Sequence, residues 1–190
     1  MSNFGNQQEQ ALRLTKNVFE TNYLAFDDFV SRYDAFQDMP FSEGLTFVAA
    51  DALFSNSKFI LSVRDPDDWY VSVKAFHKKI YDINPDSATE SDVYEKFNYL
   101  YKGFGYDVKR RFLTFFSKSN SSVDWEKLYN RDLYIDHYVY RNNLIKKYFT
   151  DAPHKLLVID VTKEATTKKL CDFLNIPPQF VIPMLHKNKT

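Results

Sequence analysis

Two short runs of large apolar residues predict buried β-strands. Residues 58–63 (KFILSV) and residues 155–161 (KLLVIDV) carry apolar side chains without strict alternation of apolar and polar positions. Such runs are typical of parallel strands that are covered on both faces. Residues 33–38 (YDAFQD) are a third, shorter strand candidate. The two longer runs therefore belong in the interior of a sheet.

Helical spacing of apolar residues predominates in much of the remaining chain. Apolar residues recur every three to four positions in residues 9–19 and in residues 42–54, and both segments are predicted to be helices. Ser42 is the expected N-cap of the second one. Residues 83–150 are also expected to be mostly helical.

A further helix follows each of the two predicted strands. Asp65 is the expected N-cap of the helix after the first strand, and Pro66 occupies the first helical position, which proline favours. The apolar stripe expected on this helix consists of Trp69, Val73, Phe76 and Ile80. After the second strand, residues 165–174 predict a helix that ends at Asn175.

This order of elements predicts the fold class. Strands that alternate with helices favour an α/β domain in which a parallel sheet is flanked by helices. A length of 190 residues is most simply one domain, residues 1–190, with residues 83–150 as a helical insertion beside the sheet.

The composition indicates which kinds of partner and which cellular compartment are to be expected. The chain has 25 basic and 25 acidic residues, and this balance argues against nucleic acid or an anionic membrane as a bulk electrostatic partner. No apolar stretch approaches the roughly 20 residues of a membrane helix, and the polar start does not resemble a signal peptide. A single cysteine, Cys171, fits a reducing compartment, and we expect a cytoplasmic protein. Cys171 is expected to pack rather than to react, and no metal-ligand spacing is visible.

The most informative polar residues lie just after the first predicted strand. Ligands of an open parallel sheet bind beyond the carboxyl ends of its strands, where Arg64 is expected. Ser72 follows about two turns into the next helix. A helix N-terminus and an arginine together favour an anion, most naturally a phosphate monoester. The alternatives are an arginine paired with a nearby carboxylate and a serine that is solvated or bonded to its own backbone.

The stretch FILSVRDPDDWYVS, residues 59–72, resembles the 3′-phosphate-binding motif of sulfotransferases that use 3′-phosphoadenosine 5′-phosphosulfate (PAPS). That motif ends a central strand with Arg, continues with Asn or Asp and Pro, and places Ser eight residues after the Arg, as here. Residues 33–61 and residues 154–178 look like the neighbouring segments of a bacterial and fungal branch of the family.

The resemblance implies a P-loop-like sulfotransferase fold in which Arg64 and Ser72 bind the 3′-phosphate of PAPS. It also implies transfer of a sulfuryl group to a hydroxyl or amine of an unidentified acceptor, either a small molecule or a glycan. Lys187 and Lys189 lie where family members place further basic contacts, although this tail matches the family poorly.

The glycine-containing loop with which the family holds the 5′-phosphosulfate is not recognisable. The residues before Glu9 contain one glycine, Gly5, and no Lys or Arg. The fold is therefore interpreted as truncated at its first strand. Besides an active enzyme, the sequence leaves open an inactive family remnant that works as a nucleotide-binding or protein-interaction module. Another chain or a second copy, and thus a homo-oligomer, could also complete the sheet.

Sulfuryl transfer needs a base to accept the proton of the acceptor. Three residues are candidates: Asp38 after the strand candidate at residues 33–38, His77 in the helix of Ser72, and His137 in the helical insertion. Each of the three could equally be an ordinary polar residue, and the sequence alone does not choose among them.

Overall fold

A computed structural model describes residues 2–26, 30, 32–115 and 123–185, with the side chains of residues 2–8 left out. Its strands are β1 (Phe59–Ser62) and β2 (Leu156–Ile159). Its α-helices are α1 (Ser2–Phe19), α3 (Thr46–Leu53), α4 (Pro66–Tyr81), α5 (Glu90–Lys96), α6 (Phe104–Phe115), α7 (Arg131–Tyr148) and α8 (Lys168–Leu174). Its 3₁₀ turns are η1 (Tyr23–Phe26), η2 (Trp125–Lys127), η3 (Pro153–Lys155) and η4 (Pro178–Phe180).

The two predicted long strands pair with each other. β1 and β2 run parallel, and the register joins Phe59 to Leu156 and Ser62 to Ile159. A hydrogen bond from the Val63 N–H to the Ile159 carbonyl, 2.8 Å, extends the ladder by one residue. The prediction of an α/β fold with a parallel sheet is confirmed, and the carboxyl ends of both strands meet at one edge.

One face of this small sheet is covered by helices. A buried cluster with partly buried neighbours is formed by Phe47 of α3, Leu61 of β1, Ile145 of α7 and Phe149, the residue that follows α7. On the strands themselves, Ile60 is 45% exposed and Val158 is 40% exposed. The expectation that both strands are covered on both faces is therefore wrong for the described residues.

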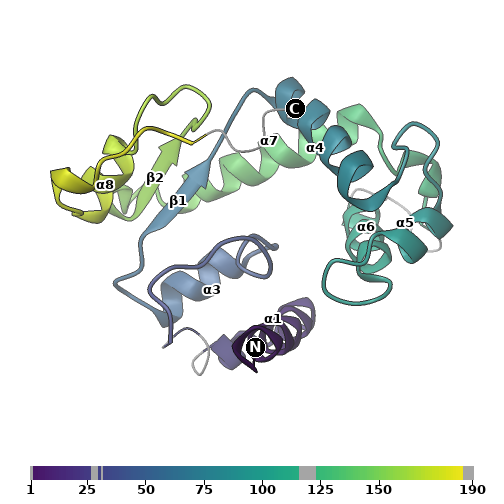
Figure 1. Cartoon of the computed structure of the whole chain (residues 1–190), viewed down its shortest axis with the longest axis horizontal. Helices are drawn as coiled ribbons and strands as arrows, with labels where there is room; N and C mark the ends of the chain where they lie inside the picture. Colours follow the sequence, from purple (N-terminus) through teal and green to yellow (C-terminus); the bar gives the residue numbers. More distant parts are fainter. Residues whose placement is uncertain (1, 27–29, 31, 116–122, 186–190) are drawn as a thin grey trace.

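The larger core lies among the helices α4, α5, α6 and the start of α7. It is rich in aromatic residues, and its buried members are Ile83, Val93, Phe97, Phe104, Leu113, Leu128, Tyr129 and Tyr134. Figure 1 shows this helical group on one side of the molecule and β1, β2 and α8 on the other, with α7 running between them. The long helix α7 thus contributes Tyr134 to the helical core and Ile145 to the sheet cluster.

The segment between α1 and α3 differs from its prediction. No strand is present at residues 33–38, which are irregular with bends at Asp34 and Asp38. Ser42 is not an N-cap, since its N–H bonds to the Asp38 carbonyl in a turn and α3 begins only at Thr46. Turn hydrogen bonds, including one from the Glu43 N–H to the Pro40 carbonyl, take the place of a sheet ladder here.

The buried face of α4 is shifted from the expected apolar stripe. Phe76 is 48% exposed and Ile80 is 54% exposed, so these two positions were assigned wrongly. The predicted positions Trp69 and Val73 do face the helical core. The other side chains of α4 on this face are Tyr70, His77 and Tyr81. Polar aromatic residues can occupy this face because the core offers them hydrogen-bond partners. In the described part of the chain, no helix is both long enough and apolar enough to span a bilayer.

Candidate functional site

The turn from β1 into α4 forms as its sequence predicts. The Asp65 side chain accepts hydrogen bonds from the N–H groups of Asp67, 2.9 Å, and Asp68, 3.2 Å. Pro66 stands in the first turn, where its missing N–H costs no helical hydrogen bond. The capping residue therefore fixes where the strand stops and the helix begins.

The hydroxyl of Tyr138, in α7, bonds to both backbone polar groups of Arg64. The Arg64 N–H donates to the Tyr138 hydroxyl at 2.9 Å, and that hydroxyl donates to the Arg64 carbonyl at 3.2 Å. The Tyr138 ring stacks on Trp69 with 4.4 Å between ring centroids and 18° between planes. Arg64 is therefore positioned by a rigid contact between α7 and α4.

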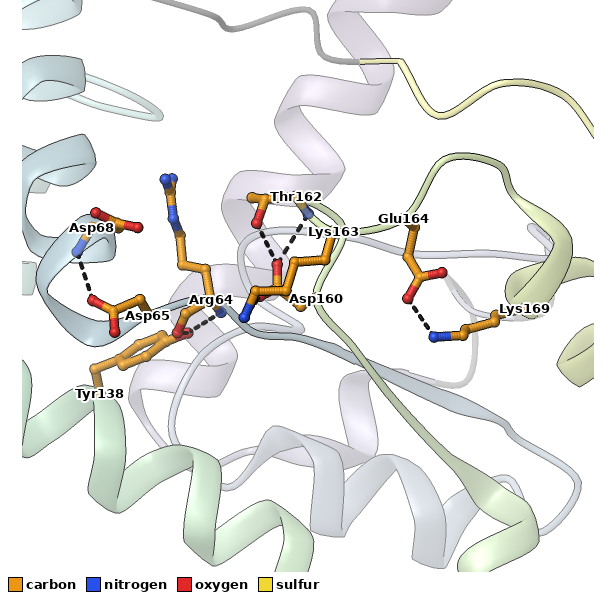
Figure 2. Close-up of polar contacts among 9 residues, drawn as sticks. All are labelled: Arg64, Asp65, Asp68, Tyr138, Asp160, Thr162, Lys163, Glu164 and Lys169. Carbon is orange, nitrogen blue, oxygen red and sulfur yellow. Dashed lines mark hydrogen bonds and ion pairs between the residues drawn. The ribbon is translucent and has the colours of Figure 1, made fainter.

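The guanidinium of Arg64 has no hydrogen-bond or ion-pair partner among the described residues. Its Nε atom is buried and makes no hydrogen bond, and Arg64 forms no ion pair with any described residue. Figure 2 shows the side chain extending away from Tyr138, above the carboxyl end of the strand. A partly buried cation without a carboxylate is costly, because desolvation is not offset by a counter-charge. An external anion would offset that cost.

Ser72 lies on the outer surface of α4. It is exposed, and its hydroxyl makes no hydrogen bond to the described residues. Seven positions separate it from the cap Asp65, almost two helical turns, so both lie on nearly the same side of the helix. Asp68, one turn before Ser72, shares this side. Binding of one phosphate by Arg64 and Ser72 together stays a prediction.

The other charges at this edge are largely committed to local partners. Asp67 forms an ion pair with Arg131 at the start of α7. After β2, Asp160 accepts hydrogen bonds from the Thr162 hydroxyl, 2.6 Å, and the Thr162 N–H, 3.0 Å, and it pairs with Lys163 at 3.0 Å (Figure 2). The Thr162 hydroxyl in particular lowers the pKa of Asp160. Asp65 and Asp68 are thus the acids beside Arg64 that form no ion pair with a described residue, and Asp65 accepts only backbone N–H groups.

His77 lies in the helical core rather than at the sheet edge. It is buried, and its Nδ1 atom lies 2.8 Å from the Tyr129 hydroxyl. Burial, helped by the charge of Lys109, lowers the pKa of His77 to about 3. An imidazole in this position is a poor proton acceptor near neutral pH.

Asp38 and His137 occupy two other places. Asp38 is exposed in the turn before α3 and accepts a hydrogen bond from the Tyr99 hydroxyl at 3.0 Å. His137 of α7 packs edge-on against Phe112, with ring centroids 5.1 Å apart, and burial lowers its pKa. Neither residue, nor His77, bonds to Arg64 or Ser72 within the described residues. Lys187 and Lys189 lie outside the described residues.

An ionic cluster that the sequence analysis did not predict lies between the turn before α3 and the helices α6 and α7. Glu43 lies 3.8 Å from Arg111 Nε, and Arg141 donates to the Ser42 carbonyl at 2.6 Å. Burial raises the pKa of Glu43, although the two arginines act in the opposite direction. Only the tertiary packing brings these residues together, so no local pattern could have indicated them.

Comparison with known proteins identifies the family of the chain. Within the described residues there is no group of three or more His, Cys, Asp or Glu side chains that could hold a metal ion. The searches of curated proteins and of solved structures gave no significant match. The sequence profile described as "Sulfotransferase domain" matches residues 1–190, the whole of the sequence. The chain therefore belongs to the sulfotransferase domain family, as its Arg64 motif indicated.

Proposed function

We propose that this protein transfers a sulfuryl group from PAPS to a hydroxyl or amine of an acceptor. The observation that carries the proposal is the unpaired guanidinium of Arg64 at the carboxyl end of β1. Nearby Asp67 and Asp160 have cationic partners, while Arg64 has none among the described residues. A site that leaves one arginine uncompensated suits an anionic ligand such as a nucleotide phosphate.

PAPS suits the residues present at this edge. Its 3′-phosphate would lie against Arg64 and the Ser72 hydroxyl, near the partial positive charge at the start of α4. The exposed carboxylate of Asp65 is bonded to the N–H groups of Asp67 and Asp68 as the helix cap. When bound, PAPS supplies the activated sulfuryl group and leaves as adenosine 3′,5′-bisphosphate. Tyr138 contributes by holding the Arg64 backbone in place.

Asp38 is the base that we assign to the acceptor. It is exposed, so an acceptor hydroxyl or amine can reach its carboxylate, and Tyr99 orients that carboxylate with a hydrogen bond. His77 is buried with a pKa of about 3, and burial lowers the pKa of His137 as well. Proton transfer to Asp38 would accompany attack of the acceptor on sulfur. We expect a cytoplasmic enzyme, and a second copy completing the sheet is part of the same proposal.

Calorimetric titration with adenosine 3′,5′-bisphosphate tests the donor site. Arg64→Ala should weaken binding by about tenfold to a hundredfold, the usual worth of a charge-assisted contact. Arg110→Ala, on the exposed surface of α6, is the charge-matched control and should bind like the wild type. Absence of binding in the wild type, or equal binding in Arg64→Ala, would contradict the site.

Turnover needs a second measurement. Incubation with radiolabelled PAPS and a panel of hydroxyl and amine acceptors should transfer label in the wild type, and Asp38→Asn should lower the rate without changing affinity for adenosine 3′,5′-bisphosphate. Nucleotide binding with no transfer to any acceptor would favour a binding module instead.

A further inference from the structure

The connection from β2 to α8 leaves the sheet at the same edge as the turn that carries Arg64. The Val63 N–H donates to the Ile159 carbonyl, and Arg64 and Asp160 are the residues that follow this bonded pair. Neighbouring strands of a sheet lie roughly 4.8 Å apart, so the two segments start side by side. Residues 160–167 therefore form the second border of the edge at which Arg64 lies, and Figure 2 shows both borders in one view.

A tight turn fixes Lys163 in this connection. Its N–H donates to the Asp160 carbonyl at 3.0 Å, and its ammonium lies 3.0 Å from the Asp160 Oδ2 atom. The side chain therefore folds back over the end of β2, and Figure 2 shows it reaching toward Arg64. The connection itself is held to the C-terminal segment, where the Met184 N–H donates to the Ala165 carbonyl at 2.9 Å.

The ion pair between Lys163 and Asp160 can open at little cost. The Lys163 side chain is 76% exposed, and exposed ion pairs add little to the stability of a fold. Asp160 keeps its other partners when the pair opens, because its Oδ1 atom accepts from the Thr162 hydroxyl and from the Thr162 N–H. The ammonium of Lys163 is therefore able to exchange the carboxylate for an anionic ligand.

Two cations at one edge suit a ligand with two anionic groups. The guanidinium of Arg64 has no partner among the described residues, and Lys163 has a partner that it can exchange. The donor of the proposed function carries anionic groups at the 3′ and the 5′ positions of one ribose, and Arg64 alone would meet only the first. We propose that Lys163 releases Asp160 and binds the 5′-phosphate while Arg64 holds the 3′-phosphate, an inference that rests on the proposed function.

Ligand-detected NMR on the full chain tests this assignment with three probes: adenosine 3′,5′-bisphosphate, adenosine 3′-monophosphate and adenosine 5′-monophosphate. Lys163→Met should weaken binding of the bisphosphate and of the 5′-monophosphate at least about fivefold, the loss of one contact with a charged group, and should leave binding of the 3′-monophosphate unchanged. Arg64→Ala should instead weaken binding of the bisphosphate and of the 3′-monophosphate.

Lys169→Met is the matched control for Lys163→Met. Lys169 belongs to the neighbouring start of α8, but its ammonium pairs with Glu164 (Figure 2), so all three affinities should equal those of the wild type. Both lysine side chains are exposed, and thermal melting should show that both variants are as stable as the wild type.

The opposing outcomes separate the role of Lys163 from the donor site. Unchanged affinity of Lys163→Met for the bisphosphate would overturn the assignment, as would an equal loss for both monophosphates or a similar loss in Lys169→Met. If Arg64→Ala weakens binding of the bisphosphate and Lys163→Met does not, the proposed donor site stands and only the role of Lys163 is wrong. No binding of the bisphosphate to the wild type would overturn the donor site and the role of Lys163 with it.

Discussion

Lys109 of α6 is a buried lysine whose removal should change the pH dependence of stability. It is 6% exposed, and its ammonium donates to the Tyr134 hydroxyl at 2.6 Å. Four aromatic rings surround the ammonium at 4.9 to 6.0 Å: those of Phe97, Phe112, Tyr129 and Tyr134. It forms no ion pair with the described carboxylates.

Burial lowers the pKa of Lys109 from its ordinary 10.5 to about 7. Between these two values the unfolded chain binds a proton that the folded chain does not, so stability rises with pH across this window. Each pKa unit corresponds to about 1.4 kcal/mol, and the rise between pH 7 and pH 9 should reach about 2 kcal/mol. The surrounding rings attract the cation and offset part of the desolvation cost.

Urea denaturation at pH 7, 8 and 9 measures this effect. The free energy of unfolding of the wild type should rise with pH, whereas that of Lys109→Met should stay nearly flat, because methionine fills a similar volume without a charge. At pH 7 the variant should be as stable as the wild type or more so. Lys102→Met, at an exposed position, should retain the wild-type slope. Parallel profiles in the wild type and in Lys109→Met would refute the reasoning.

Three further variants address the core and the donor site. Because the pKa of His77 is lowered to about 3, the unfolded chain binds a proton between pH 3 and pH 6.5 that the folded chain does not, and stability should fall as the pH drops through this range. His77→Phe should flatten this fall in urea titrations at pH 4.5 to 7. An unchanged slope would contradict the prediction. Asp68→Asn should tighten binding of adenosine 3′,5′-bisphosphate by about twofold to threefold at low salt, as calorimetry can check; unchanged affinity would place Asp68 away from the phosphate. Tyr138→Phe should lower the free energy of unfolding by about 1 to 2 kcal/mol and weaken nucleotide binding, since it removes both hydrogen bonds to the Arg64 backbone. Wild-type affinity for adenosine 3′,5′-bisphosphate in this variant would show that the two bonds are not needed for binding.

Local signals were sufficient to predict the strand-turn-helix unit around Arg64. The cap Asp65, the proline after it and the apolar run before it all act within a few residues, so their structure follows from the sequence. β2 and the end of α8 at Asn175, which adopts a left-handed conformation, were predicted for the same reason. The unit around Arg64 also carries the motif at residues 59–72 that resembles the family.

Features that depend on tertiary packing could not be predicted. Residues 33–38 have strand-like composition, but turn bonds to Asp38 and Pro40 shape the chain that follows them. The apolar period of α4 fits two adjacent faces almost equally, and the hydroxyl of Tyr129 favours the one with His77. Lys16 of α1 and Tyr101, whose ring lies 5.7 Å from the Lys16 ammonium, are likewise brought together only by packing.

The balance of charge over the whole chain says little about the site, because local pairing decides what an anion meets. The 25 basic and 25 acidic residues cancel overall, yet at the sheet edge Asp67 and Asp160 are paired, while the guanidinium of Arg64 has no partner in the part of the chain that the structure describes. The Tyr138 hydroxyl bonds to the backbone of Arg64 and not to its guanidinium. One positioned and uncompensated cation is therefore compatible with a neutral protein, and it is the feature that a nucleotide phosphate would use.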